Sequence, residues 1–439
     1  MHRSVATLGI LCFFSFHTFG QRTSVSPYSQ YGLGDLQWIS NGRSFGMGGM
    51  TIGQYNPLFF NADNPSTLSA LDLTTFDFGV NSTIYNISNA QNPDGLRNYS
   101  TNFSHIKFAI PVYKGQTIAF GYMPYTFIGY DIRTLEKNEE PLPTVLYRFT
   151  GNGGFNQAFF AFGSKPIKGF SIGLSMRYFF GDKERLNIVI PDMANTLNTR
   201  QNSVIRINGL LYNTGITYQL KLANNKELVI AGIFSPSIQL VSEYKDYKYS
   251  YSGGDFGTPV DTFTRQTDES RVTYPMQWGA ALTYQEYSTN HTIPVLTAGA
   301  EVRYIQGSDL SLPVEGSTWQ NSFRYAAGLS LLPRYFFQGW ERSTKYINRL
   351  EYRLGAFYET GVVNIQNQDI SQLGMTFGFS LPLRIRGLAP GEVKYNHINF
   401  GLVAGRRGTK TGNLIQEDFI RYQVGITLND KWFIKYKYR

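Results

Sequence analysis

Long stretches of the chain alternate strictly between apolar and polar residues, and this period constrains the fold more than any other feature. In Phe170–Tyr178, which reads FSIGLSMRY, every second residue is apolar, and Ser, Gly and Arg stand between them. Leu296–Tyr304 (LTAGAEVRY) and Leu350–Tyr358 (LEYRLGAFY) repeat the arrangement. Successive side chains of a β-strand point to opposite faces, so a period of two predicts strands with one apolar and one polar face.

The length of the alternating stretches distinguishes between two kinds of all-β fold. Strands of soluble sandwiches run to about five or six residues, whereas these run to about nine or ten, the length that crosses a bilayer at a tilt. Aromatic residues end the apolar face, as Phe170 and Tyr178 do, which is typical of the girdles of a membrane barrel. We therefore predict an all-β fold, a transmembrane antiparallel β-barrel, over a secreted sandwich or a propeller.

The number of candidate strands exceeds an even count by one. We expect strands near 73–86, 103–113, 116–130, 155–164, 169–181, 204–220, 226–243, 272–286, 295–305, 321–332, 347–361, 370–384, 395–406, 418–428 and 431–438. Bacterial barrels have even strand numbers, so we predict about 14 strands, with one pair forming a single bent strand. Long polar loops are expected at 184–203, 245–271 and 306–320.

The C-terminal tail, KWFIKYKYR, predicts a closing strand with aromatic residues toward lipid and lysines toward the lumen. Such a tail resembles the signal that the barrel assembly machinery reads, which makes that machinery an expected partner during biogenesis. The candidate signal residues are Trp432, Phe433, Tyr436 and Tyr438.

The N-terminus predicts export. Residues 1–20 combine a short basic region with an apolar stretch and a small residue before Gln21, the pattern of a cleaved signal peptide. The single cysteine, Cys12, lies within it, so the mature chain would have no disulfide. No other run of about 18 apolar residues exists, which excludes spanning helices. We expect a barrel over 73–439 in the outer membrane of a Gram-negative bacterium, contacting its lipid.

The segment 21–72 suits neither a helix nor a central strand. It contains a glycine cluster and two Asn-Pro pairs, which disrupt regular structure, yet it is too apolar for a solvated linker. Irregular backbone cannot face lipid but can lie inside a barrel. We therefore predict an N-terminal luminal plug (hatch), with candidate residues Gly46, Gly48, Gly49, Gly53, Asn56, Pro57, Asn64 and Pro65.

These plug residues resemble the hatch of FadL-type outer-membrane transporters, which carry a glycine-rich stretch and an Asn-Pro-Ala motif before a barrel of 14 strands. Ser66 replaces the alanine here. The opening Ser26–Asp35 and the ending Asn429–Lys435 resemble barrels of the Bacteroidetes lineage, to whose broad family PorV of the type IX secretion system belongs. The resemblance implies passive transport of hydrophobic small molecules such as long-chain fatty acids.

The same resemblance implies lateral exit of the solute through a kinked strand. Gly121 and Pro124 are the candidate gate residues, because a proline removes a ladder hydrogen bond within Thr117–Tyr130. The alternative is that Pro124 simply ends a strand or lies at a rim bulge.

Six charged residues are expected on the lumen side of their strands: Arg177, Glu301, Arg303, Glu351, Arg353 and Glu359. They could bind a carboxylate head group or tether the plug, and the alternative is a set of structural ion pairs in a wet barrel.

Other functions have little support in the sequence. The three histidines outside the predicted signal peptide are scattered, no metal or hydrolase motif is present, and we expect no enzyme activity, no cofactor and no nucleic-acid binding. The alternative to transport is a non-transporting barrel that acts as a scaffold or shuttle in a secretion or assembly complex. A surface of Tyr244, Tyr247, Tyr249, Tyr251 and Phe256 is a candidate for partner binding in that case.

Overall fold

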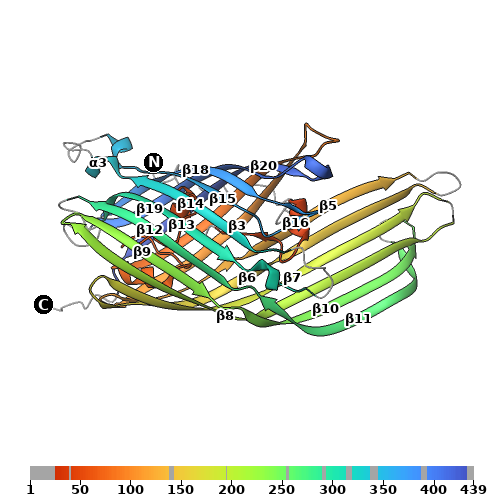
Figure 1. Ribbon diagram of the computed structural model, residues 1–439, viewed down its shortest axis with the longest axis horizontal. Coiled ribbons are helices and arrows are strands. Elements are labelled where there is room, and N and C mark those ends of the chain that lie inside the picture. The colour runs from red at the N-terminus through yellow and green to blue at the C-terminus, as the bar shows by residue number, and fades with distance from the viewer. Residues whose placement is uncertain are drawn as a thin grey trace, which may run out of the picture.

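The protein forms one closed antiparallel β-barrel of 14 strands, with an N-terminal segment packed inside it, in a computed structural model (Figure 1). The structure describes residues 25–38, 41–137, 143–193, 195–253, 257–288, 293–312, 319–336, 345–386 and 393–432. No helix within these ranges is long and apolar enough to cross a membrane. The predictions of fold class, strand number and internal plug are confirmed.

Each barrel strand pairs with its neighbours in the chain, and β20 closes the ring on β2 through Thr74 opposite Asp430. Three of the strands are broken in two: β4 with β5, β9 with β10, and β11 with β12. The strands are β2 (Thr74–Ser88), β3 (Leu96–Tyr113), β4 (Gln116–Pro124), β5 (Thr126–Glu136), β6 (Val145–Ile167), β7 (Phe170–Pro191), β8 (Asn198–Ala223), β9 (Lys226–Ser235), β10 (Ile238–Ser252), β11 (Thr258–Tyr274), β12 (Gln277–Tyr287), β13 (Pro294–Ile305), β14 (Ser322–Leu331), β15 (Glu351–Glu359), β18 (Gln372–Arg386), β19 (Val393–Gly408) and β20 (Gln416–Asp430).

The two ends of the barrel differ. At one end, which we call the turn end, short turns such as Lys114–Gly115 and Lys168–Gly169 join the strands. Trp432, which follows β20, also lies at this end. At the other end, the hairpin end, several strands continue as long hairpins. Sequences 184–203 and 245–271, predicted as loops, belong to strands of these hairpins, so that prediction is wrong. In β11 most residues are exposed on both faces, which removes the alternation that marks a strand. β10 buries every second residue from Leu240 to Asp246, but two of these four are polar, so the apolar period is weak there.

The hairpins form a wall that rises beyond the barrel on one side (Figure 1). It consists of β5, the hairpin-end halves of β6, β7 and β8, and then β10 and β11. β8 has 26 residues, more than twice the 9–11 that cross a bilayer. The wall begins where the strands break or bend, at Tyr125, at Gly153–Gly154 with positive φ, and at Pro236 and Pro275. Proline cannot donate to a ladder, and glycine accepts the unusual φ of a bend.

Within the described residues, β11 pairs with β10 alone, so its second edge is open over 17 residues. Most of its side chains are exposed on both faces.

The C-terminal prediction needs correction. β20, not the tail, occupies the place beside β2. The other fourteen candidates supply all 14 strands, so no two of them form a single bent strand, and the candidate at 431–438 lies outside the described residues after Trp432. Trp432 is exposed, and Phe433, Tyr436 and Tyr438 lie outside the described residues, as does the predicted signal peptide.

The N-terminal segment contains only short elements. These are η1 (Pro27–Gln30), β1 (Asp35–Leu36), α2 (Gly42–Phe45) and η2 (Pro65–Ala70). The loops add η3 (Gly307–Asp309), α3 (Pro333–Phe336), η4 (Tyr346–Arg349), β16 (Asn364–Ile365), β17 (Gln368–Asp369) and η5 (Thr411–Asn413).

Candidate functional site: the plug and the barrel interior

Two asparagines shape the plug by capping its short helices. The Asn41 side chain accepts from the Ser44 amide at 2.6 Å at the start of α2, and Asn64 accepts from the Ser66 amide at 3.1 Å at the start of η2. Asn64 Nδ2 also donates to the Ile52 carbonyl at 2.8 Å. The Asn-Pro pair at 64–65 thus begins a helical turn and ties it to the glycine segment, in agreement with the usual order of a cap followed by proline.

Glycines allow the plug backbone to touch the barrel backbone. Gly48 has φ +68°, and a Cβ there would lie 2.5 Å from the Ala356 carbonyl oxygen. Gly355 on β15 faces it, where a Cβ would lie 2.3 Å from the Gly48 nitrogen. The remaining predicted plug residues lie in the same segment, and Gly46, Gly49, Gly53, Asn56 and Pro65 are buried with it.

A buried carboxylate on the barrel wall holds the plug through its backbone. Glu301 on β13 accepts from the amides of Thr51 at 2.7 Å and Ile52 at 2.9 Å. The same carboxylate accepts from Arg303 Nε at 3.0 Å, and Arg303 reaches Asp63 of the plug at 3.0 Å. Each charge therefore has an opposite charge or a hydrogen-bond donor beside it, which a buried ion requires.

Asp63 is the plug's own member of this network. Burial favours its neutral form, yet the guanidinium groups of Arg303 and Arg177 and the Thr51 hydroxyl outweigh burial and lower the pKa of Asp63 from its ordinary 3.8. The carboxylate is therefore ionised at neutral pH.

A second group of charges lies toward the turn end. Arg43 of α2 donates from Nε to Glu351 at 2.8 Å, and Arg353 donates to the Gly42 carbonyl at 3.2 Å. On the opposite wall, Arg177 donates to the Ala62 carbonyl at 3.0 Å. Five of the six predicted lumen charges thus contact plug residues directly.

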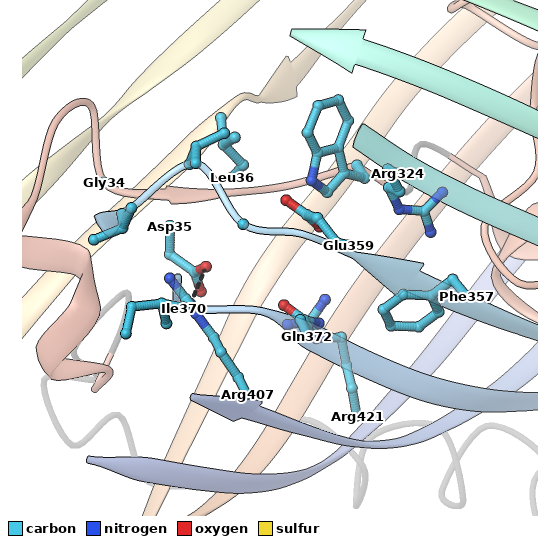
Figure 2. A pocket seen from close by; sticks show the side chains of 14 residues that line it. Gly34, Asp35, Leu36, Arg324, Phe357, Glu359, Ile370, Gln372, Arg407 and Arg421 are labelled. Carbon is cyan, nitrogen blue, oxygen red and sulfur yellow. Dashed lines mark hydrogen bonds and ion pairs between the residues drawn. The ribbon is translucent and has the colours of Figure 1, made fainter. Parts of the chain in front are cut away.

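The sixth predicted lumen charge, Glu359, lines a small cavity toward the hairpin end (Figure 2). The cavity measures only about 40 Å³. Asp35 of β1 lies in it and pairs with Arg407 at 2.8 Å, so the N-terminal segment is tethered here too.

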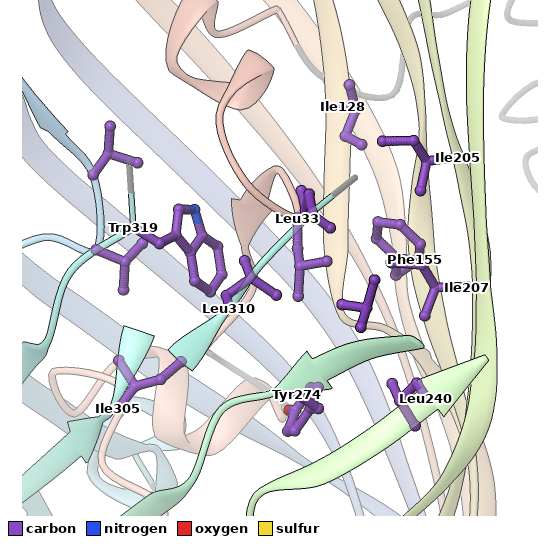
Figure 3. Close-up of a cluster of buried hydrophobic side chains, with 14 of the residues drawn as sticks. Leu33, Ile128, Phe155, Ile205, Ile207, Leu240, Tyr274, Ile305, Leu310 and Trp319 are labelled. Atoms are coloured by element: carbon purple, nitrogen blue, oxygen red, sulfur yellow. The ribbon is translucent and has the colours of Figure 1, made fainter. Parts of the chain in front are cut away.

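Apolar side chains fill the hairpin-end half of the lumen (Figure 3). Leu33 of the N-terminal segment packs among residues from both sides of the barrel, including Ile128 and Phe155 from one side and Leu310 and Trp319 from the other. This cluster closes the lumen above the plug.

Pro124 ends β4, and Tyr125 separates it from β5. The pairing with β6 shifts by one residue across this break, from Pro124 opposite Asn156 to Ile128 opposite Gly153. Beyond Ile106, β3 pairs with no residue of β5 in the described chain, and the tip of its hairpin stands apart in Figure 1. The neighbours of β5 on that side are Asp35 and Leu36 of β1 instead.

The cavity beside this break is also small. It measures about 50 Å³ and extends between Pro124 and Asp63 past Trp38. Gly121, the other residue predicted for a gate, lies inside β4 with no room for a Cβ, which would meet the Ile106 carbonyl at 2.5 Å.

Sequence reasoning missed several residues of the interior. Arg43 and Asp63 lie in the plug, where no periodicity marks the direction of a side chain. Arg324, which donates to the Gly48 carbonyl at 2.7 Å, could have been found, because it alternates with apolar residues in β14 as Arg303 does in β13. A further cluster of buried charges also lies at alternating strand positions: His105 and Lys107 of β3 each lie 3.1 Å from Asp77 of β2.

No group of three or more possible metal ligands occurs among the described residues. The fold and this interior define a class: a plugged β-barrel of the FadL type, resembling outer-membrane proteins. A family model matches residues 1–439, and the chain belongs to the BamG family.

Solved structures support the class at low sequence identity. A Pseudomonas aeruginosa FadL homologue has a TM-score of 0.58 and 13% identity over 90% of this chain and 99% of its own. The toluene transporter TodX of Pseudomonas putida has a TM-score of 0.57 and 14% identity over 90% and 99%. No curated protein matches the sequence. At this identity the likeness concerns the fold alone.

Proposed function

We propose that this protein is an accessory barrel of the outer-membrane barrel assembly machinery, in which it docks partner proteins instead of passing a solute. The family supports this role, since its name places its members with that machinery. In this proposal the turn end faces the periplasm and the wall stands outside the cell, following the usual arrangement of short turns and long hairpins.

The closed lumen is the observation that carries the proposal. A transporter needs a continuous apolar path, but the described cavities beside Pro124 and Glu359 measure only about 50 and 40 Å³. A cavity of about 280 Å³ at the turn end shares no lining residue with either of them. A protein cavity of about 150 Å³ holds benzene, so neither of the two small cavities holds a fatty acid. Backbone contacts, ion pairs and the apolar cluster all close the same space.

The wall offers a surface for a partner. Outward-facing Trp278, Tyr304 and Phe323 contact one another at the hairpin ends of β12, β13 and β14, and the rings of Trp278 and Tyr304 are stacked with centroids 5.6 Å apart. Aromatic residues of this kind mark the membrane interface. β11 lies beyond Trp278 and so stands outside the bilayer.

The open edge of β11 suits strand pairing with another protein. Exposed edges are templates for added strands, which natural proteins protect with proline and charge. Pro259 and several charges on β11 limit promiscuous pairing, while Val260 and Phe263, each 58% exposed, supply apolar contact. The tyrosine surface expected from the sequence differs, because Tyr244 and Tyr251 are buried against the interior and Phe256 lies outside the described residues.

The test combines purification and site-specific photo-crosslinking. The tagged protein is isolated from outer membranes in mild detergent, with a photo-crosslinking amino acid at Phe263 or, as control, at exposed Tyr99 on the far side of the mouth. We expect the central assembly barrel to co-purify and to crosslink from position 263 alone. Purification of the protein without assembly components, and equal crosslinking at both positions, would contradict the proposal.

Transport remains the second candidate, because the interrupted pairing between β3 and β5 resembles a lateral exit. Uptake of a labelled long-chain fatty acid tests it. A sealed barrel predicts uptake equal to that of cells lacking the protein, and Pro124→Ala should leave it unchanged. Uptake that depends on the protein and falls with Pro124→Ala would favour transport.

A further inference from the structure

Three neighbouring hairpins at the turn end each combine an exposed lysine with an exposed apolar residue. The pairs are Tyr113–Lys114 where β3 turns into β4, Ile167–Lys168 where β6 turns into β7, and Lys221–Leu222 at the end of β8. We call them the lysine turns. The apolar members are 72%, 65% and 54% exposed in that order. The same combination on three separate hairpins indicates a single surface with a single role.

Backbone contacts hold the lysine turns side by side. The amide of Lys165 donates to the Gly115 carbonyl at 2.8 Å, and the amide of Gln219 donates to the Gly169 carbonyl at 2.7 Å. Because paired strands lie about 4.8 Å apart, the three hairpins follow one another directly around the rim. Lys165 does not belong to this surface, since its Nζ donates to Gln219 at 2.7 Å and lies over the Tyr55 ring of the plug.

The apolar members share the outward face of their strands, which lipid covers in a membrane barrel. Ile167 lies opposite Phe170 in the ladder, and opposite residues of a strand pair share a face. That face of β7 continues with exposed Ile172. On β8, Leu222 continues the exposed outward row that includes Leu220. Apolar and tyrosine side chains at the ends of such rows are typical of the membrane interface.

The lysines of these turns form no ion pair with a carboxylate within the described ranges, where the ion-paired lysines lie in other places. Glu227 lies opposite Lys221 in the ladder, but its carboxylate lies 3.5 Å from the Gln219 amide and 3.4 Å from the Tyr287 hydroxyl instead. Asp72, which precedes β2, is a further exposed carboxylate at this end. The positive charge of the three lysines is therefore available to an anion from outside the chain.

We propose that the lysine turns bind the phosphate groups of anionic phospholipids in the leaflet that surrounds the turn end. The ammonium groups reach the phosphates, while Tyr113, Ile167 and Leu222 contact the acyl chains below them. A lysine stem lies readily along apolar surface with its charge at the polar level, and clustered lysines attract anionic lipid. The outward apolar members favour lipid over an acidic protein, which offers them no acyl chains. The proposal takes the turn end as the periplasmic end but does not depend on the assembly role.

The experiment measures lipid binding to the full barrel in an uncharged detergent by native mass spectrometry. The probes are dioleoyl phosphatidylglycerol, which is anionic, and dioleoyl phosphatidylcholine, which has no net charge. Inorganic phosphate and acetylated tetraglutamate are added as competitors, because they represent a free anion and an acidic peptide. Binding in detergent does not require the assembly partners, so its outcome is separate from that of the crosslinking test.

Three variants separate the charge from the apolar contact. The lysine variant combines Lys114→Gln, Lys168→Gln and Lys221→Gln. The matched control removes the same charge from exposed positions at the hairpin end, through Arg133→Gln, Lys248→Gln and Arg265→Gln. The apolar variant combines Tyr113→Ser and Ile167→Ser and keeps every charge.

We expect phosphatidylglycerol to bind more tightly than phosphatidylcholine. The lysine variant should reduce this preference at least about tenfold, since each lysine near an anionic surface contributes roughly a fivefold gain. The control should keep the preference, and the apolar variant should weaken the binding of both lipids.

Equal binding of the two lipids, or an equal loss in the lysine variant and its control, would overturn the proposal. Displacement of phosphatidylglycerol by inorganic phosphate would identify a site for a free anion and overturn it as well. Displacement by tetraglutamate, together with unchanged lipid binding in the apolar variant, would do the same in favour of an acidic protein.

Discussion

Replacing Glu301 with glutamine should release the glycine segment of the plug while leaving the barrel closed. The Glu301 side chain is fully buried and makes three short contacts, to the amides of Thr51 and Ile52 and to Arg303. Glutamine has the same shape, but its amide can satisfy the two backbone donors only by turning its NH₂ group toward Arg303. The NH₂ group of the glutamine would then face the Nε–H of Arg303, so two donors would meet, and Arg303 would lose a charge partner.

The expected magnitude follows from these contacts. Removing one partner of a buried ion pair lowers the stability of the folded state by about 3–5 kcal/mol. Each 1.4 kcal/mol is a factor of ten, so local opening of the segment should become at least about a hundredfold more frequent. Hydrogen exchange of the Thr51 and Ile52 amides, followed by mass spectrometry, measures this opening directly.

Glu269→Gln is the control, because this glutamate is exposed on β11 and contacts no plug residue. Exchange at residues 51–52 should match the unmodified protein in that variant. If Glu301→Gln also leaves this exchange unchanged, Glu301 does not hold the plug, and the glycine backbone contacts alone must do so.

Three further predictions address the plug. Gly355→Ala should destabilise the docked plug, because its Cβ would lie 2.3 Å from the Gly48 nitrogen; Gly232→Ala, with its nearest atom at 3.6 Å, should be tolerated in the same thermal unfolding measurement. Asn64→Ala should cost about 1–2 kcal/mol by loss of a helix cap, seen as faster proteolysis of the plug. The pKa of Asp63 is lower in the folded protein than in the unfolded chain, so its ionised form stabilises the plug fully above pH 3.8 and this contribution disappears as pH falls through the folded value. The protection factors of the plug amides, which correct exchange for the intrinsic effect of pH, should therefore be constant at neutral pH and fall below 3.8, and Asp63→Asn should remove that fall.

The sequence was most informative where the chain has different surroundings on its two faces. The alternation in Leu296–Tyr304 predicted that Glu301 and Arg303 point inward, and in the structure both are buried against the plug. In β11 both faces are exposed, so the same logic predicted a loop. The period of two reports a difference between two environments and is lost where there is none.

The site was harder to predict than the barrel, for the same physical reason. Asp63 lies on irregular backbone and Arg43 on a helix of only four residues, so no period relates position to direction at either residue. The inward direction of their partners, Arg303 and Glu351, could be predicted from the alternation in their strands. Which plug residue each one binds could not, because the paired residues are more than 200 positions apart in the chain. The open edge of β11 is equally invisible to a one-dimensional pattern, since pairing is a property of neighbours.

Two of the plug's helical turns, η2 and α2, rest on opposite halves of the barrel, so the plug connects strands that lie far apart in the chain. η2 packs against β4, β6, β7 and β8, in the first half of the barrel sequence, whereas α2 packs against β18, β19 and β20, its last three strands. The N-terminal segment can therefore be fully docked only when both groups of strands have taken their places. Because α2 also contacts β20, the strand that pairs with β2, closure of the ring and completion of the plug's contacts depend on each other.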